Sequence, residues 1–135
     1  MGRSLLILLD THVVLWLTSD PSRLSGNAKA AIEVARKNGE GLAICDITLL
    51  EITTLATKGR IHLGSSLESI LQEVEVHFAV LPITGRACAR AMGLPATYPR
   101  DPADRIIVAT ALVEGLSLIT ADREIRRSKL VPTIW

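Results

Sequence analysis

The segment SLLILLDTHVVLWLT, residues 4–18, holds a single acidic residue, Asp10, between two strongly apolar runs. Burying a carboxylate without a partner is costly, so a polar turn or a bound cation has to compensate for this position. The run 5–9 is typical of a strand that is buried on both faces, and 12–17 continues as a short helix. The sequence therefore predicts that Asp10 directly follows a buried strand.

Strand-like and helix-like segments alternate along the rest of the chain. Further strands are predicted at 42–45, 78–83, 116–120 and 130–134. Helices are predicted at 26–37, 48–58, 67–76, 84–93, 103–115 and 121–128. Strands that alternate with helices form right-handed crossovers and a parallel sheet. We expect one α/β domain over residues 1–135, a three-layer sandwich with a central parallel sheet of four to five strands and helices on both faces.

The composition favours a globular protein of the cytosol. Hydrophobic residues make up 48% of the chain, and 15 basic against 14 acidic residues leave a net charge of +1. A general attraction for nucleic acid is not visible, so any such binding needs a local patch. Two lone cysteines, Cys45 and Cys88, fit a reducing compartment. Because the apolar run 5–9 is too short for a signal peptide or a membrane span, we expect a cytoplasmic protein without membrane association.

Three further acids occupy positions like that of Asp10. Glu51 stands in the first turn of a predicted helix, Asp104 opens another, and Asp122 follows a predicted strand. Ligands of open α/β sheets bind at the carboxyl ends of strands, so these acids can converge there. Like charges held close together raise each other's pKa and destabilise the fold unless a cation neutralises them. Carboxylate oxygens suit Mg²⁺ or Mn²⁺, no Cys/His cluster suits zinc, and such a site supports metal-assisted phosphodiester hydrolysis.

Each acid, taken alone, also has an ordinary structural explanation. Thr48 and Glu51 have the T-x-x-E spacing of a capping box. Asp101 before Pro102 is typical of a helix N-cap, and Ser25 is a further N-cap candidate. The remaining acids could complement a helix dipole. Caps normally face solvent, however, whereas the acid in the opening segment lies between apolar runs, so capping does not account for the whole group.

Several motifs follow one another in order over almost the whole chain. They are LILLDTHVVLWL at 6–17, KGRIHL at 58–63, LPIT at 81–84, DPADRIIVATA at 101–111, EGLSLITAD at 114–122 and VPTIW at 131–135. With these motifs the chain resembles PIN-domain ribonucleases, specifically the toxins of type II toxin–antitoxin pairs of the VapC type. It departs from the family at Leu50, where Trp is frequent, at Ala103, where an aromatic is usual, and at Tyr98-Pro99-Arg100, where His is frequent. These departures concern the substrate loop and remove no candidate metal ligand.

The resemblance implies a single PIN domain with an acidic metal site, carried here by Asp10, Glu51, Asp104 and Asp122. It also implies cleavage of single-stranded RNA with Mg²⁺ or Mn²⁺, a homodimer, and inhibition by a cognate antitoxin. A different class stays open, a PIN scaffold without turnover that acts as an RNA- or protein-binding module, although the presence of all four acids argues against it. An aspartyl phosphatase is disfavoured because such enzymes have D-x-D where this chain has D-T-H, at 10–12.

Five neighbouring residues are candidates to support the acids or to contact RNA: Thr11, Asp101, Arg105, Thr120 and Arg123. Arg105 could hold an RNA backbone or pair with a neighbouring acid. His12 is expected to pack against its apolar neighbours. Both tryptophans are expected in the core or an interface, because 3% aromatic residues argue against recognition led by base stacking. The apolar helices around 11–17 and 49–56 exceed what one small core hides, which predicts self-association and a partner site.

Overall fold

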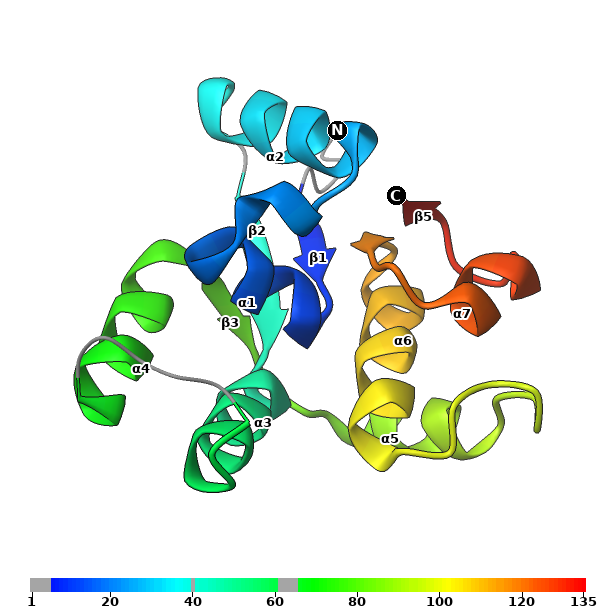
Figure 1. The fold of residues 1–135 in the computed structure, drawn as a ribbon. Coiled ribbons are helices and arrows are strands. Elements are labelled where there is room, and N and C mark those ends of the chain that lie inside the picture. Colours follow the sequence, from blue (N-terminus) through cyan, green and yellow to red (C-terminus); the bar gives the residue numbers. More distant parts are fainter. Residues whose placement is uncertain (1–5, 40, 61–65) are drawn as a thin grey trace.

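The computed structural model describes residues 6–39, 41–60 and 66–135; Leu5 of the first predicted strand and the end of the KGRIHL motif lie outside them. The described strands form one parallel sheet (Figure 1). They are β1 (Ile7–Leu9), β2 (Leu42–Cys45), β3 (Ala79–Leu81), β4 (Ser117–Ile119) and β5 (Thr133–Ile134). Helices cover both faces of this sheet, so the predicted three-layer α/β sandwich is confirmed.

The order of the strands in the sheet is β3-β2-β1-β4-β5. The chain builds outward from β1 through β2 to β3 and then returns to the other side of β1 with β4 and β5. Leu8 of β1 lies beside Ala43 of β2 and beside Leu118 of β4. The winding direction therefore reverses between β1 and β4, and open parallel sheets bind ligands at the carboxyl ends of the strands at such a switch point.

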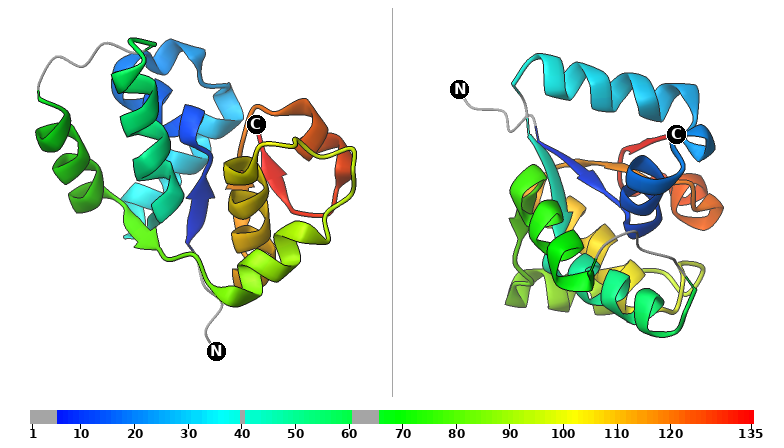
Figure 2. Two further views of the ribbon diagram at one scale, coloured as in Figure 1. Left: turned by 90° about the horizontal axis from the view of Figure 1, so that it is seen from below. Right: turned by 60° about the vertical axis from the view of Figure 1, so that its left-hand side comes forward.

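The helices fall into two groups according to the core that they cover. The first face carries α1 (Thr11–Ser19), α2 (Gly26–Lys37) and α4 (Leu67–His77), with the 3₁₀ turn η1 (Pro21–Arg23) between α1 and α2. The second face carries α5 (Gly85–Met92), α6 (Pro102–Glu114) and α7 (Arg123–Ser128). Between them, α3 (Asp46–Thr57) contributes Ile52 to the first core and packs Ile47 against the second. The left view of Figure 2 shows the blue strand β1 between these two sets of helices.

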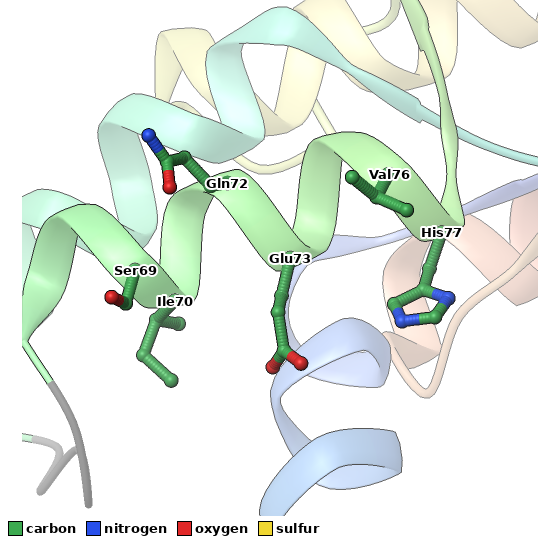
Figure 3. Close-up of a pocket in the computed structure, with 6 residues that line it drawn as sticks. All are labelled: Ser69, Ile70, Gln72, Glu73, Val76 and His77. Atoms are coloured by element: carbon green, nitrogen blue, oxygen red, sulfur yellow. The ribbon is translucent and has the colours of Figure 1, made fainter.

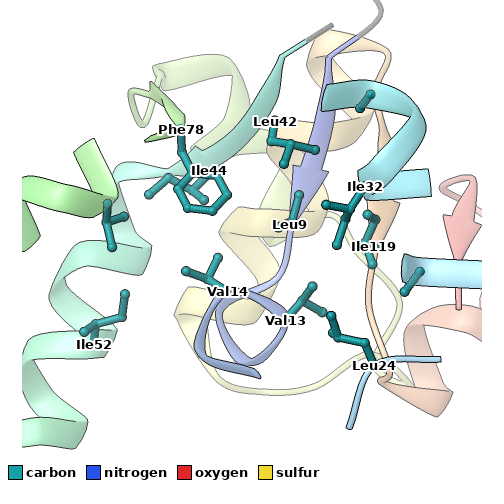
Figure 4. Close-up of a cluster of buried hydrophobic side chains, with 13 residues drawn as sticks. Leu9, Val13, Val14, Leu24, Ile32, Leu42, Ile44, Ile52, Phe78 and Ile119 are labelled. Carbon is teal, nitrogen blue, oxygen red and sulfur yellow. The ribbon is translucent and has the colours of Figure 1, made fainter. Parts of the chain in front are cut away.

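The central strands supply alternate side chains to both cores. Leu9 and Ile44 lie in the first cluster with Phe78 (Figure 4), whereas Leu8 and Ala43 lie in the second. Successive side chains of a strand point to opposite faces, so a strand covered on both faces has to be apolar throughout. This explains why the first strand is a continuous apolar run in the sequence.

Several predicted helix ends are present as expected. The Ser25 hydroxyl accepts the backbone N–H of Ala28 at 3.0 Å, and Oδ1 of Asp101 accepts that of Ala103 at 2.8 Å. Gly115 ends α6 with φ of 68°, in the left-handed region that favours glycine. None of the helices within the described ranges is long and apolar enough to cross a membrane.

The predicted capping box at Thr48 and Glu51 is wrong. Helix α3 begins at Asp46, two residues earlier than predicted, directly after β2. Cys45 is the N-cap residue, and the acidic Asp46 in the first turn complements the helix dipole, so no threonine cap is required. Thr48 therefore lies inside the helix, and Glu51 stands in its second turn rather than its first.

Proline limits the length of two of the predicted strands. The strand predicted at 78–83 ends at Leu81, before Pro82, and the one predicted at 130–134 begins only after Pro132. Proline has no N–H to donate to a sheet, so it confines both strands to the residues beside it.

Candidate active site

Asp10 joins the end of β1 to the start of α1 and is buried, with 8% of its surface exposed. Its Oδ1 accepts the backbone N–H of Thr11 and its Oδ2 accepts the hydroxyl of Thr120, both at 2.8 Å. Burial raises the pKa of the Asp10 carboxyl, and these two hydrogen bonds oppose the rise because they favour the charged form. Polar contacts at both oxygens thus compensate in part for the burial of this carboxylate.

Thr120 connects the ends of two neighbouring strands at the switch point. It follows β4, is fully buried, and donates its hydroxyl to Asp10. Its oxygen accepts the backbone N–H of Asp122 at 3.1 Å. Asp122 in turn caps α7, with its Oδ1 accepting the N–H of Ile125 at 3.1 Å. The backbone N–H of Asp10 also donates to the carbonyl oxygen of Ile119 at 3.0 Å, which links the ends of the same two strands.

Glu51 reaches this edge of the sheet from α3. The Thr11 hydroxyl donates to Oε1 of Glu51, and the hydroxyl oxygens of Thr11 and Thr48 lie 3.0 Å apart. Thr11 therefore contacts Asp10 through its backbone and Glu51 through its side chain. The sequence interpretation missed Thr48 as a partner; its position three residues before Glu51, on the same face of a helix, is the signal that indicates it.

Asp104 lies in the first turn of α6 and is half-buried. Burial raises its pKa to about 7, and four other carboxylates add to the rise. These are Asp10, Asp101, Glu51 and Asp122, in decreasing order. Burial also raises the pKa of Glu51, with Asp101 and Asp10 adding to it. The structure thus brings the four predicted acids together at one edge of the sheet, with Asp101 beside them.

The donor set fits a hard divalent cation in its chemistry. Every candidate ligand is a carboxylate, the type that Mg²⁺ and Mn²⁺ prefer. A bound cation would favour the charged forms against the burial and the repulsion that raise the pKa values of Asp10, Glu51 and Asp104. Among the residues that the structure describes, no three His, Cys, Asp or Glu side chains are placed to hold one ion between them. Mg²⁺ usually keeps several waters and takes only one or two carboxylates directly.

Arg105 contacts the loop that leads to the acids of α6. Its guanidinium donates to the carbonyl oxygens of Ala91, Leu94 and Pro95 at 3.3, 3.2 and 3.1 Å. These carbonyls lie at the end of α5 and in the residues that follow it. These contacts tie the loop to α6 and do not engage an acid, whereas contact of Arg105 with RNA stays a prediction.

The remaining predicted neighbours lie around the same loop and the next helix. Tyr98, in the segment that departs from the family pattern, is buried and its hydroxyl hydrogen-bonds that of Ser128 in α7. Asp101 is exposed at the start of α6, where it caps the helix. Arg123 is exposed at the first position of α7, next to Asp122. The loop before α6 is therefore attached to both α6 and α7.

Two cavities lie away from these acids. An open pocket of about 500 Å³ follows one side of α4, where Glu73 and His77 point the same way (Figure 3). A cavity of about 220 Å³ lies between the start of α5 and the end of α6 and includes the buried Thr110. None of their described lining residues is a candidate acid, so neither cavity forms part of the candidate site.

Comparison with known proteins identifies the family. A profile of the PIN domain matches residues 7–129, which include all four predicted acids. The chain belongs to the PIN-domain family. "Ribonuclease VapC22" of Mycobacterium tuberculosis is 40% identical to this PIN-domain chain over 131 residues, 96% of this chain and 98% of that protein.

Solved structures with a similar fold include chains from toxin–antitoxin complexes. One from Klebsiella pneumoniae is similar to this PIN domain with a TM-score of 0.68 and 24% identity, over 96% of both chains. Another belongs to VapBC2 from Rickettsia felis, bound to a DNA fragment from their promoter. It gives a TM-score of 0.70 and 16% identity, over 95% of this chain and 96% of that one. At these identities the likeness supports the fold alone, a PIN-like five-stranded sandwich.

Proposed function

We propose that this PIN-domain protein is an endoribonuclease that cleaves single-stranded RNA with Mg²⁺ or Mn²⁺, and that it is the toxin of a toxin–antitoxin pair. The observation that carries the proposal is the group of carboxylates at the switch point, where burial and mutual repulsion raise the pKa of Asp10, Glu51 and Asp104. Such repulsion destabilises a fold that binds no cation. The 40% identity to a protein named as a ribonuclease supports RNA as the substrate.

Asp10, Glu51, Asp104 and Asp122 would hold the cation, directly or through water. When bound, the cation supplies activation of the attacking water and polarisation of a phosphate oxygen. The chain's own contribution is positioning. Thr120 and the Thr11 backbone fix Asp10, and the Thr11 hydroxyl fixes Glu51, so the carboxylates keep their relative places without metal.

Basic residues beside the acids are proposed to bind the RNA backbone. Arg123, Arg126 and Arg127 of α7 are exposed and follow Asp122 directly. Contacts from arginine to phosphate fix the register of a nucleic acid without reading its sequence. Because the net charge of the whole chain is only +1, a local group of this kind is needed to attract a polyanion.

An antitoxin partner and a homodimer complete the proposal. Structural relatives from toxin–antitoxin complexes support the partner. Leu50 of α3 and Val76 of α4 are 60% and 79% exposed, whereas Leu15 and Leu17 of α1 are half-buried against the first core. Exposed apolar side chains favour an interface. Sedimentation that shows only monomer across micromolar concentrations would contradict the homodimer.

An RNA substrate and free thiols favour the cytoplasm as the compartment in which this protein acts.

The test of the ribonuclease is cleavage of a mixed single-stranded RNA pool by the purified chain. We expect cleavage with Mg²⁺ or Mn²⁺, none in chelator, and none from Glu51→Gln. Glu33→Gln, which makes the same change at an exposed position of α2, should cleave like the wild type. RNA binding without cleavage in every cation would favour the inactive binding module instead.

A further inference from the structure

Three aromatic rings and one arginine form a cluster on the outer side of α1. The ring centroids of His12 and Trp16 lie 6.0 Å apart, and those of Trp16 and Trp135 lie 5.8 Å apart. The Arg23 guanidinium of η1 lies over the Trp16 ring, 4.6 Å from its centroid. We refer to His12, Trp16, Arg23 and Trp135 as the aromatic cluster. It joins the first helix, the turn after it and the last residue of the chain.

The aromatic cluster begins beside the candidate active site. His12 directly follows Thr11, whose backbone N–H donates to Asp10 and whose hydroxyl donates to Glu51. His12 and Arg23 are exposed, so the prediction that His12 packs against its apolar neighbours is wrong. Physically, His12 lies on the side of α1 that turns away from the sheet, while Val13 packs into the core.

Packing against the protein core holds the two tryptophans of the cluster in place. Trp16 and Trp135 are half-buried and pack against the first core, in agreement with their predicted place in the core or an interface. Asn27 of α2 fixes the backbone of Trp135 by donating to its carbonyl oxygen at 3.0 Å. The part of each tryptophan ring that is not buried therefore faces solvent, and the rings are held in a fixed position.

We propose that the aromatic cluster is a binding subsite for a nucleobase of the single-stranded RNA that the neighbouring carboxylates cleave. The inference rests on the proposed function and adds to it one stacking position for the strand. The 3% aromatic content argues against stacking as the main source of RNA recognition, and a single subsite is consistent with that. Unstacked bases of single-stranded RNA stack on aromatic rings and on the plane of arginine side chains. The aromatic cluster offers both surfaces, and two of its rings belong to α1, the helix that begins directly after Asp10.

Arg23 favours RNA over an apolar protein segment as the occupant. Its guanidinium lies over the Trp16 ring in a cation–π contact, and the Arg23 side chain is exposed to solvent. A planar cation of this kind can stack on a base while its charge attracts the adjacent phosphate. A purely hydrophobic partner would leave that charge unpaired, which is unfavourable on burial.

Intrinsic fluorescence reports directly on the cluster, because the two tryptophans of the chain, Trp16 and Trp135, both belong to it. The chain is titrated with a single-stranded RNA oligonucleotide in Ca²⁺, and the intactness of the RNA is checked on a gel. An abasic oligonucleotide of equal length and charge is the control. We expect quenching and affinity at least about fivefold higher with the RNA that has bases, the lower limit for stacking one base.

Variants separate stacking from general charge. Arg23→Gln should weaken binding of the RNA with bases at least about threefold, whereas Arg86→Gln, at an exposed position on the other face, should not. Trp135→Leu leaves Trp16 as the single tryptophan, and its fluorescence should still be quenched. Circular dichroism verifies that each variant is folded.

Equal affinity and equal quenching with the abasic oligonucleotide would overturn the subsite, as would unchanged RNA affinity in Arg23→Gln. Normal RNA binding combined with lost binding of the antitoxin would assign the cluster to the protein partner and also overturn it. If the wild type cleaves RNA but neither the abasic oligonucleotide nor Arg23→Gln lowers the affinity, only the subsite is wrong. If it neither binds nor cleaves RNA, the proposed function itself is wrong.

Discussion

Asp10 shows how single side chains of the site are kept in a place that folding alone disfavours. Hydrogen bonds from Thr11 and Thr120 reach both of its oxygens, yet burial still raises its pKa. Glu51 and Asp104 are affected in the same direction. A carboxyl with a higher pKa in the folded than in the unfolded state binds its proton more tightly when folded, so ionising it lowers stability. Without a cation, the site is therefore a source of instability at neutral pH.

The raised pKa of Asp104 makes the stability of the protein depend on pH. Its pKa is about 7 in the folded chain against an ordinary value of 3.8. The stability contribution of its proton is fully present below the unfolded value, declines as the pH rises, and is lost above about 7. In chelator, the Tm of the wild type should fall between about pH 5 and 7. The Tm of Asp104→Asn should fall less, and parallel curves for the two proteins would contradict the raised pKa.

The loop before α6 is the element that sets the position of Asp101 and Asp104. Arg105 ties its start to α6 through three carbonyl oxygens, and Tyr98 ties its middle to α7 through Ser128. The contacts of Arg105 and Tyr98 connect the loop to α6 and α7, so they orient the N-terminus of α6. The residues that depart from the family pattern are thus held in a defined loop.

Arg105→Ala is expected to lower the free energy of unfolding by about 2–3 kcal/mol, because it leaves three carbonyl oxygens without their charged donor. Urea denaturation measures this change. Arg105→Lys should recover part of it, and Arg86→Gln should stay within about 0.5 kcal/mol of the wild type. Unchanged stability with a large loss of RNA affinity would instead make Arg105 an RNA contact.

At the scale of the whole molecule, the architecture follows from local pattern and the site from contacts that no local pattern encodes. Continuous apolar strands and periodic helices predict a two-sided sheet, and they place Asp10 and Asp122 at strand ends. The partner Thr120 lies 110 residues from Asp10, and Thr48 lies 37 residues from Thr11. Such pairs depend on the order of the strands, which the hydrophobic pattern does not contain. The hydrophobic pattern likewise does not indicate that Arg105 donates to Ala91, Leu94 and Pro95, because these contacts depend on the path of the loop between α5 and α6.

Divalent cations should stabilise the whole molecule. An ion that binds only the folded state adds about 1.4 kcal/mol at ten times its Kd, which corresponds to several degrees in Tm. Thermal unfolding in chelator and in millimolar Mg²⁺ or Mn²⁺ measures this, with NaCl added to equal ionic strength. The increase should shrink in Glu51→Gln, and a Tm that does not respond to either cation would count against the metal site.

The most direct test of the central claim is the rate of RNA cleavage by Asp10→Asn in Mg²⁺ or Mn²⁺. Asparagine keeps the size and an acceptor oxygen for the Thr11 N–H, but it lacks the charge that holds a cation. We predict at least about a 100-fold loss of cleavage, since residues that only support a metal ligand already contribute roughly 10- to 100-fold. The Tm in chelator should be equal to or above that of the wild type, and Asp20→Asn at the exposed end of α1 should cleave normally. Full cleavage by Asp10→Asn, or wild-type cleavage that persists in chelator, would contradict a metal-dependent ribonuclease centred on Asp10.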